Sequence, residues 1–112
     1  MKAYEIINYL ENYFPLELQM DFDCCGLQIG NRNKEIKKVY IALNADNETL
    51  QACIEQDCQM LITHHPFLLE KIKNMDVNEH QGYFISLAMR HDIVVYSLHT
   101  CLDRGKKWYF YE

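Results

Sequence analysis

Three short apolar runs, separated by stretches of helical periodicity, constrain the fold of this chain more than any other feature. They occupy residues 38–43, 60–63 and 93–97, contain β-branched side chains and are bounded by polar residues, as is typical of strands. The first two runs and the helical stretch between them form a strand–helix–strand unit, whose crossover we expect to be right-handed. The sequence therefore predicts an α/β fold with a small mixed sheet flanked by helices.

Helical periodicity appears in three stretches. Residues 4–14 place apolar side chains on one face, and Pro15 ends the pattern. A second helix is predicted to run to about residue 56, after a segment rich in N-cap candidates. A third is predicted after Asn78, which resembles the cap of a capping box. The glycine-bounded segment 27–29 is short enough to be an edge strand.

Size and charge exclude several classes of protein. The chain has 112 residues, enough for one small domain, and 49% hydrophobic residues exclude a disordered chain. A net charge of −5 argues against broad binding of nucleic acid or anionic membrane. No apolar run approaches the roughly 20 residues that span a bilayer, and the first residues resemble an amphipathic helix, not a signal peptide. We therefore expect a cytoplasmic protein.

The cysteines point to the same compartment. There are five, an odd number, and with no secretory signal they indicate free thiols. Cys53 is interpreted as a small buried apolar residue of the second helix. Cys24 and Cys25 are adjacent in a predicted loop, where a redox role is an alternative.

The side chains that carry chemistry gather where two predicted strands end. His64 and His65 follow one apolar run, and His99 and Asp103 follow another. In an open α/β sheet ligands bind outside the carboxyl ends of the strands, and imidazoles with a carboxylate suit a divalent metal such as Zn, Fe or Mn. Consecutive strand residues point to opposite faces, so only a turn, which Pro66 makes plausible, aims both histidines at one centre.

Other residues allow two interpretations. His99 is either a ligand or a capping or core residue with a satisfied ring. Asp21 and Asp23 precede the short glycine-bounded segment, where they either form a turn and cap a neighbouring element or belong to the site. His80 and His91 are interpreted as surface residues of the third helix.

Four motifs in this order resemble the Nif-three-like family, whose members are often called type 2 GTP cyclohydrolase I. They are the opening helix with its proline at 5–15, Asp-Phe-Asp-Cys-Cys-Gly-Leu-Gln-Ile-Gly at 21–30, Leu-Ile-Thr-His-His-Pro at 61–66, and His-Thr-Cys-Leu-Asp at 99–103. The resemblance implies an α/β fold of two related halves, a dinuclear metal centre and commonly a ring-shaped hexamer. This chain resembles the first half of that fold over residues 1–103.

The resemblance also implies roles for individual residues. His64, His65 and Asp103 stand at family ligand positions, with Asp103 as the bridge between two metal ions. His99 then becomes a neighbour of the metals. Asp21, Asp23 and His99 are expected to orient a substrate or take a proton beside them.

This chain departs from the family pattern in several places. Cys24 and Cys101 stand where the family has Asn, and Asn44 where a strand-end Asp is common. The family's remaining ligands, a His and a Glu from a longer chain, have no counterpart here, and residues 104–112 form an atypical aromatic and basic tail. We therefore expect a shortened family member whose uncovered face drives self-association.

Three functional hypotheses follow. The first is a metal-dependent hydrolase of the GTP cyclohydrolase type 2 kind, which uses up to two divalent ions to activate a water against a nucleotide or another small molecule. The second is a non-catalytic module that binds metal or a protein partner. The third is a fragment without function. In the first two, a homo-oligomer is expected, as in the family.

Overall fold

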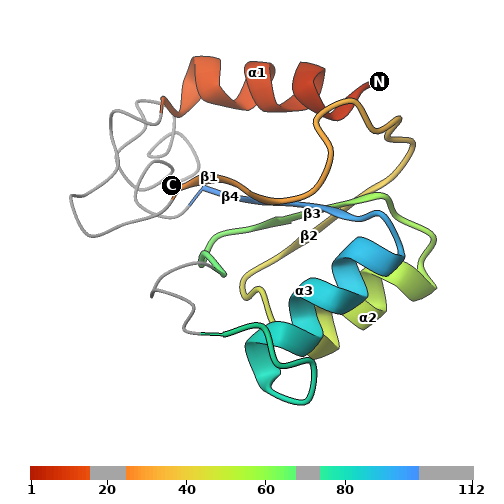
Figure 1. Ribbon diagram of the computed structural model, residues 1–112. Helices are drawn as coiled ribbons and strands as arrows, with labels where there is room; N and C mark the ends of the chain where they lie inside the picture. Colours follow the sequence, from red (N-terminus) through yellow and green to blue (C-terminus); the bar gives the residue numbers. More distant parts are fainter. Residues whose placement is uncertain (16–24, 68–73, 99–112) are drawn as a thin grey trace.

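The computed structural model describes residues 1–15, 25–67 and 74–98, which form three layers. One sheet lies in the middle, with α1 on one face and α2 and α3 on the other (Figure 1). In chain order the elements are α1 (Ala3–Tyr13), β1 (Gly26–Ile29), β2 (Val39–Ala42), α2 (Asn47–Glu55), β3 (Met60–Thr63), α3 (His80–Arg90) and β4 (Val94–Ser97).

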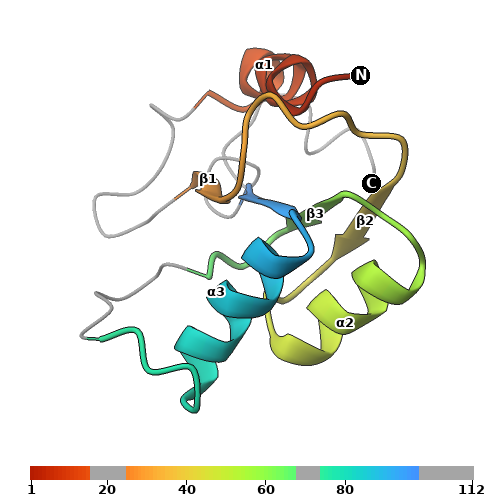
Figure 2. The ribbon, with the colours of Figure 1, turned by 45° about the vertical axis from the view of Figure 1, so that its right-hand side comes forward.

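The sheet is mixed, as predicted. Its strand order is β1-β4-β3-β2, in which β2, β3 and β4 are parallel and β1 runs antiparallel to β4. The short segment predicted as an edge strand is β1, which occupies one edge. Successive steps from β2 to β3 to β4 move in one direction across the sheet, so α2 and α3 cover the same face (Figure 2).

Alternate side chains of β3 and β4 enter two separate cores, because strand residues point to opposite faces in turn. Leu61 and Val95 pack with residues of α2 and α3, among them Cys53 and Phe84. On the other face the core beneath α1 contains Ala3, Ile7, Ile36, Met60, Ile62, Val94 and Tyr96. All four residues of β3 and all four of β4 are buried, as expected for central strands covered on both faces.

The start of α3 differs from the predicted capping box. The helix begins at His80 with Glu79 as its N-cap, and the side chain of Glu79 makes no capping hydrogen bond. Asn78 instead donates from its amide Nδ2 to the Asp76 carboxylate across 3.2 Å. The Asn78 side chain is thus engaged in the turn before the helix and does not cap the helix. The prediction of Asn78 as cap is wrong.

Other expectations from the sequence are confirmed. Cys53 is fully buried, and burial raises the pKa of its thiol to about 12. His80 and His91 are exposed, as predicted for surface residues. None of the described helices combines the length and apolar character needed to cross a bilayer. The predicted tail at 104–112 lies outside the described residues.

Candidate functional site

The two adjacent histidines lie where the central strand β3 ends. β3 stops at Thr63, and His64 and His65 form a bend immediately beyond it. The neighbouring strand β2 ends on the same edge of the sheet, because the two strands are parallel and in register. Polar residues that follow β2, beginning with Asn44, therefore lie beside the histidines.

Two buried hydroxyls hold the backbone of this bend. Thr63, 1% exposed, donates from Oγ1 to the carbonyl of His65 across 2.7 Å. Ser97 of β4, fully buried, donates from Oγ to the carbonyl of His64 across 3.1 Å. On the other side, the backbone N–H groups of both histidines donate to the carbonyls of Ala42 and Leu43. The bend is thus tied to both neighbouring strands.

The bend brings the two imidazoles together. Their ring centroids are 5.0 Å apart and their planes meet at 62°, an edge-to-face arrangement. His64 is half-buried and His65 is exposed. The expectation that both rings leave a turn and not a strand is confirmed, since neither residue belongs to β3.

The ring of His65 is held by a side chain from the end of β2. Its Nδ1 lies 2.6 Å from the amide oxygen Oδ1 of Asn44. Because an amide oxygen accepts and does not donate, this contact requires the proton on Nδ1. In the neutral ring the other nitrogen, Nε2, then carries the lone pair with which an imidazole binds a metal.

Asp46, the acid nearest to Asn44 in the sequence, has a structural role. Asp46 caps α2 by accepting the backbone N–H of Thr49 at 2.8 Å. Hydrogen bonds from the backbone and side chain of Thr49 lower the pKa of the Asp46 carboxyl below its ordinary value. Next to the cap, Nδ2 of Asn47 lies 3.2 Å from Nδ1 of His80, a contact that joins the first turns of α2 and α3. Asp46 is therefore charged at neutral pH, and its carboxylate caps α2.

The described residues supply only part of the predicted site. Within residues 1–15, 25–67 and 74–98, no three His, Cys, Asp or Glu side chains gather closely enough to hold a metal ion. The structure brings His64 and His65 together. The remaining predicted site residues, Asp21, Asp23, His99 and Asp103, lie outside the described residues.

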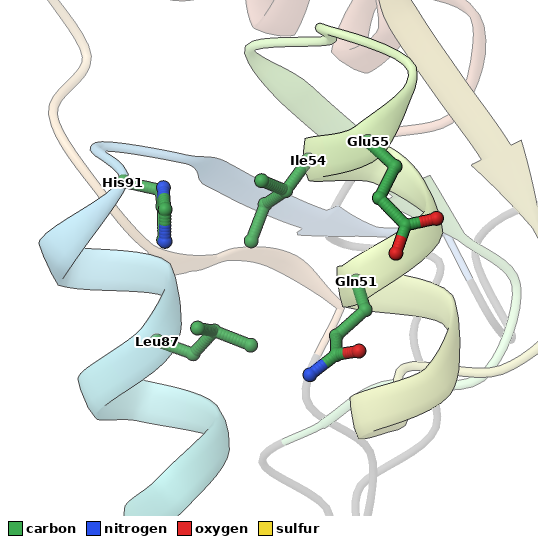
Figure 3. Close-up of a pocket in the computed structure, with 5 residues that line it drawn as sticks. All are labelled: Gln51, Ile54, Glu55, Leu87 and His91. Carbon is green, nitrogen blue, oxygen red and sulfur yellow. The ribbon is translucent and has the colours of Figure 1, made fainter.

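Two surface hollows lie away from the histidines. One, of about 120 Å³, lies between α2 and α3 and is lined by Gln51, Ile54, Glu55, Leu87 and His91 (Figure 3). The other, of about 290 Å³, lies beside Gly30 and Asp92. Both adjoin the segments that lead into the amino ends of β3 and β4. His64 and His65 lie at the opposite, carboxyl ends of the strands. Small-molecule sites usually enclose roughly 300–1,000 Å³, and the first hollow is well below that range. The second is close to its lower limit, but Asp92 is the one ionisable residue that lines it.

A family model described as Duf34/NIF3 (NGG1p interacting factor 3) matches residues 1–107. The chain belongs to the DUF34/NIF3 family. It is 36% identical over 101 residues to a GTP cyclohydrolase 1 type 2 homolog of Listeria innocua. Family structures agree: the Bacillus cereus protein related to NIF3 superposes with a TM-score of 0.88 at 33% identity, and reduced HcgD from Methanocaldococcus jannaschii with 0.88 at 38%.

These DUF34/NIF3 relatives are longer than this chain. The alignment covers 90% of this chain but 27% of the Listeria protein. The superpositions cover 95% and 96% of this chain, but 29% of the Bacillus cereus protein and 43% of HcgD. The expected resemblance to this fold is therefore confirmed, over a part of the relatives' length.

Sequence reasoning missed three residues that position the histidines. In the sequence, Asn44 is notable only as a departure from the family pattern, although it contacts His65. Thr63 and Ser97 are the last residues of β3 and β4. A hydroxyl at the end of an otherwise apolar buried strand is the signal that would have indicated them, since a buried hydroxyl needs a hydrogen-bond partner.

Proposed function

We propose that the chain binds divalent transition metal through His64 and His65, with Asp103 as a further ligand. The observation that carries this proposal is the bend after β3, which holds two imidazoles with their centroids 5.0 Å apart. Two neutral imidazoles and a carboxylate are a ligand set that suits Zn, Fe or Mn. The order of the sequence motifs supports Asp103 as the third ligand. If two ions bind, Asp103 would be the ligand that they share.

The described residues around the histidines fit such a site. A metal-binding imidazole usually donates its second ring nitrogen to an oxygen acceptor, which fixes the tautomer and the ring orientation. Asn44 provides this acceptor for His65 at 2.6 Å. The hydroxyls of Thr63 and Ser97 fix the backbone that carries the two rings. The site is therefore organised by its neighbours independently of a metal.

For the chemistry, we propose metal-dependent hydrolysis of a nucleotide, such as GTP, or of another small molecule. A bound divalent ion would supply a Lewis acid and lower the pKa of a coordinated water. Asp21, Asp23 and His99 would orient the substrate or accept a proton beside it. The names of the curated relatives, GTP cyclohydrolase 1 type 2 homologs, support a nucleotide.

A non-catalytic module that binds metal or a protein partner is the second candidate. The description of the family, NGG1p interacting factor 3, favours a role in protein interaction. The two candidates share the metal site and differ in turnover. They are separated by an activity measurement on protein whose metal content is known.

The test is a calorimetric titration of metal-free protein with Zn²⁺, Mn²⁺ and, without oxygen, Fe²⁺. The wild type is expected to bind at least one of them, and the His64→Ala/His65→Ala variant to lose that binding. His80→Ala/His91→Ala is the matched control, because it removes two exposed imidazoles outside the bend. Equal binding by the wild type and the His64→Ala/His65→Ala variant would contradict the proposal. Metal-loaded and chelator-treated protein are then compared on a panel of nucleotides and phosphoesters, where equal rates would reject metal-dependent hydrolysis.

A further inference from the structure

Two buried cysteines lie at the two ends of the turn that joins α2 to β3. Cys53 belongs to the last turn of α2, and Cys58 precedes β3. Cys53 is fully buried and Cys58 is 8% exposed, and both thiols are free. His64 and His65 follow β3, at its other end. The two cysteines are therefore reactive groups that the proposed function does not use.

The turn between the two cysteines is a Schellman motif. The backbone N–H of Cys58 donates to the carbonyl of Cys53 at 3.0 Å, and that of Asp57 donates to the carbonyl of Ile54, also at 3.0 Å. Asp57 has a φ of 59°, the left-handed conformation that ends a helix in this way. The motif commonly brings together the side chains at its two ends, which are those of Cys53 and Cys58 here.

The backbone at this turn has the dimensions of a disulfide. A hydrogen bond of 3.0 Å between the carbonyl of Cys53 and the N–H of Cys58, with the bond lengths at either end, keeps the two Cα atoms within about 7 Å. Disulfides in proteins usually join Cα atoms about 4.4–6.8 Å apart. A bond between the two sulfurs therefore requires no large movement of α2 or β3.

The two sulfur atoms also face each other's segment. The Sγ atom of Cys53 lies 3.9 Å from the carbonyl oxygen of Cys58 and 3.9 Å from that of Met60. The Sγ atom of Cys58 lies 3.8 Å from the carbonyl oxygen of Gln56, at the end of α2. Each thiol thus points from its own segment toward the segment that carries the other.

The surroundings of the two thiols set the order in which they react. Burial, followed by the charge and the hydrogen bond of the Cys58 thiol, raises the pKa of Cys53 to about 12. Because the thiolate is the nucleophile, Cys53 is protected from direct attack on an oxidant. Cys58 has the only exposed surface of the pair, and this surface is narrow. A small oxidant that reacts first at Cys58 fits this arrangement.

We infer that Cys53 and Cys58 form a reversible intrachain disulfide when the chain meets hydrogen peroxide. The Cys58 thiolate attacks one oxygen of the peroxide, the O–O bond breaks, and the hydroxide released takes up a proton to give water. The sulfur of Cys53 then attacks the sulfenic acid on Cys58; the S–S bond forms as the S–O bond breaks. The proton of Cys53 leaves with the second hydroxide as water. Two thiols lose two electrons, and one peroxide becomes two waters.

The disulfide would act as a redox-sensitive link within the fold. It would join the end of α2 to the start of β3 by a covalent bond at a place now held by hydrogen bonds. A thiol reductant would reopen it by exchange. This inference does not depend on the proposed metal site.

Peptide mapping of the wild-type protein tests the inference directly. Trypsin cleaves after Lys38 and Lys71 and releases residues 39–71 as one peptide, in which Cys53 and Cys58 are the only cysteines. The protein is treated with increasing hydrogen peroxide, quenched with catalase, alkylated in denaturant and digested. We expect the peptide to lose two hydrogen masses and to resist alkylation, and dithiothreitol added before alkylation to restore two reactive thiols.

Two results of this mapping would overturn the inference. One is a peptide that stays fully alkylated at every peroxide concentration. The other is a peptide that carries sulfinic or sulfonic acid in place of the disulfide.

A pair of variants links the disulfide to the fold. Peroxide is expected to raise the thermal midpoint of the wild type by about 4–8 °C, since the disulfide constrains the unfolded chain. Cys58→Ser should lose this rise, whereas Cys25→Ser, the matched control at a partly exposed thiol beside Leu98, should keep it. Circular dichroism establishes that both variants are folded. An equal rise in Cys58→Ser and the wild type would contradict the proposed link.

Discussion

The hydroxyl of Ser97 donates to the carbonyl oxygen of His64 across 3.1 Å and joins the end of β4 to the bend that follows β3. A second buried hydroxyl, that of Thr63, bonds the next carbonyl along the bend, that of His65. The backbone carbonyls of both histidines are therefore held by side chains that take no part in metal binding, while their N–H groups bond the backbone of Ala42 and Leu43. Thr63 and Ser97, the last residues of β3 and β4, thus hold the bend that carries the candidate site.

Replacing Ser97 with alanine removes one of these supports. The carbonyl of His64 then loses a buried donor, so Ser97→Ala is expected to lower the free energy of unfolding by about 1–3 kcal/mol. It is also expected to weaken metal binding, since the bend is less constrained. Urea denaturation and calorimetric metal titration measure the two effects. Ser86→Ala on α3 is the control, and equal behaviour of the two variants would contradict this role of Ser97.

Asn44 is expected to control the ring of His65. Asn44→Ala removes the acceptor at Nδ1, and loss of such a partner typically lowers metal affinity about 10–100-fold. Asn44→Asp keeps an acceptor oxygen and should retain most of the affinity. Asn8→Ala, at an exposed position of α1, provides the control. If Asn44→Ala bound metal as tightly as the Asn8 variant, the contact would have no part in the site.

Asp46 gives the fold a defined pH dependence. Its pKa is lower in the folded chain than in the unfolded one, so its charge stabilises the fold above the unfolded pKa, and this contribution is lost as the pH falls through the folded pKa. Asp46→Asn keeps a good cap without the charge. The wild type should therefore exceed Asp46→Asn in unfolding free energy at pH 7. The difference should begin to shrink as the pH falls below the unfolded pKa of about 3.9 and should disappear only below the lower pKa of the folded chain. Urea titrations at several pH values measure it, and a difference that does not change with pH would contradict this assignment.

Gly30 is required where the chain leaves β1. Its φ is +119°, and a Cβ built there would lie 2.8 Å from the Cα of Val94. Gly30→Ala is therefore expected to destabilise the fold by more than about 1 kcal/mol, through both backbone strain and this contact. Arg32→Ala, in the exposed turn just beyond, should change stability little. Thermal unfolding compares the two, and similar midpoints would contradict the argument.

Much of the fold can be predicted because its signals are local. The apolar runs of β3 and β4 and the amphipathic period of α1 are visible in the sequence, since the two strands are buried on both faces and the helix is buried on one. The cap of α3 is not, because Asn78 has two partners within reach and the preceding turn takes it. Local preference cannot decide between such competing hydrogen bonds.

The candidate site divides in the same way. His64 and His65 are recognisable because they are adjacent at the end of a predicted strand. The contact between Asn44 and His65 joins residues 21 positions apart and depends on the parallel pairing of β2 with β3. The hydroxyls of Thr63 and Ser97 resemble ordinary strand residues until the neighbouring carbonyls are placed. Supporting residues of this kind are defined by tertiary structure.

The metal content of the purified protein tests the central claim most directly. Elemental analysis per chain is made on wild-type protein and on the His64→Ala/His65→Ala variant, both purified without added metal and without chelator. We expect one to two transition-metal ions per wild-type chain and essentially none in the variant. Equal metal content in the two proteins, or none in the wild type even after incubation with Zn²⁺, Mn²⁺ or Fe²⁺, would contradict it.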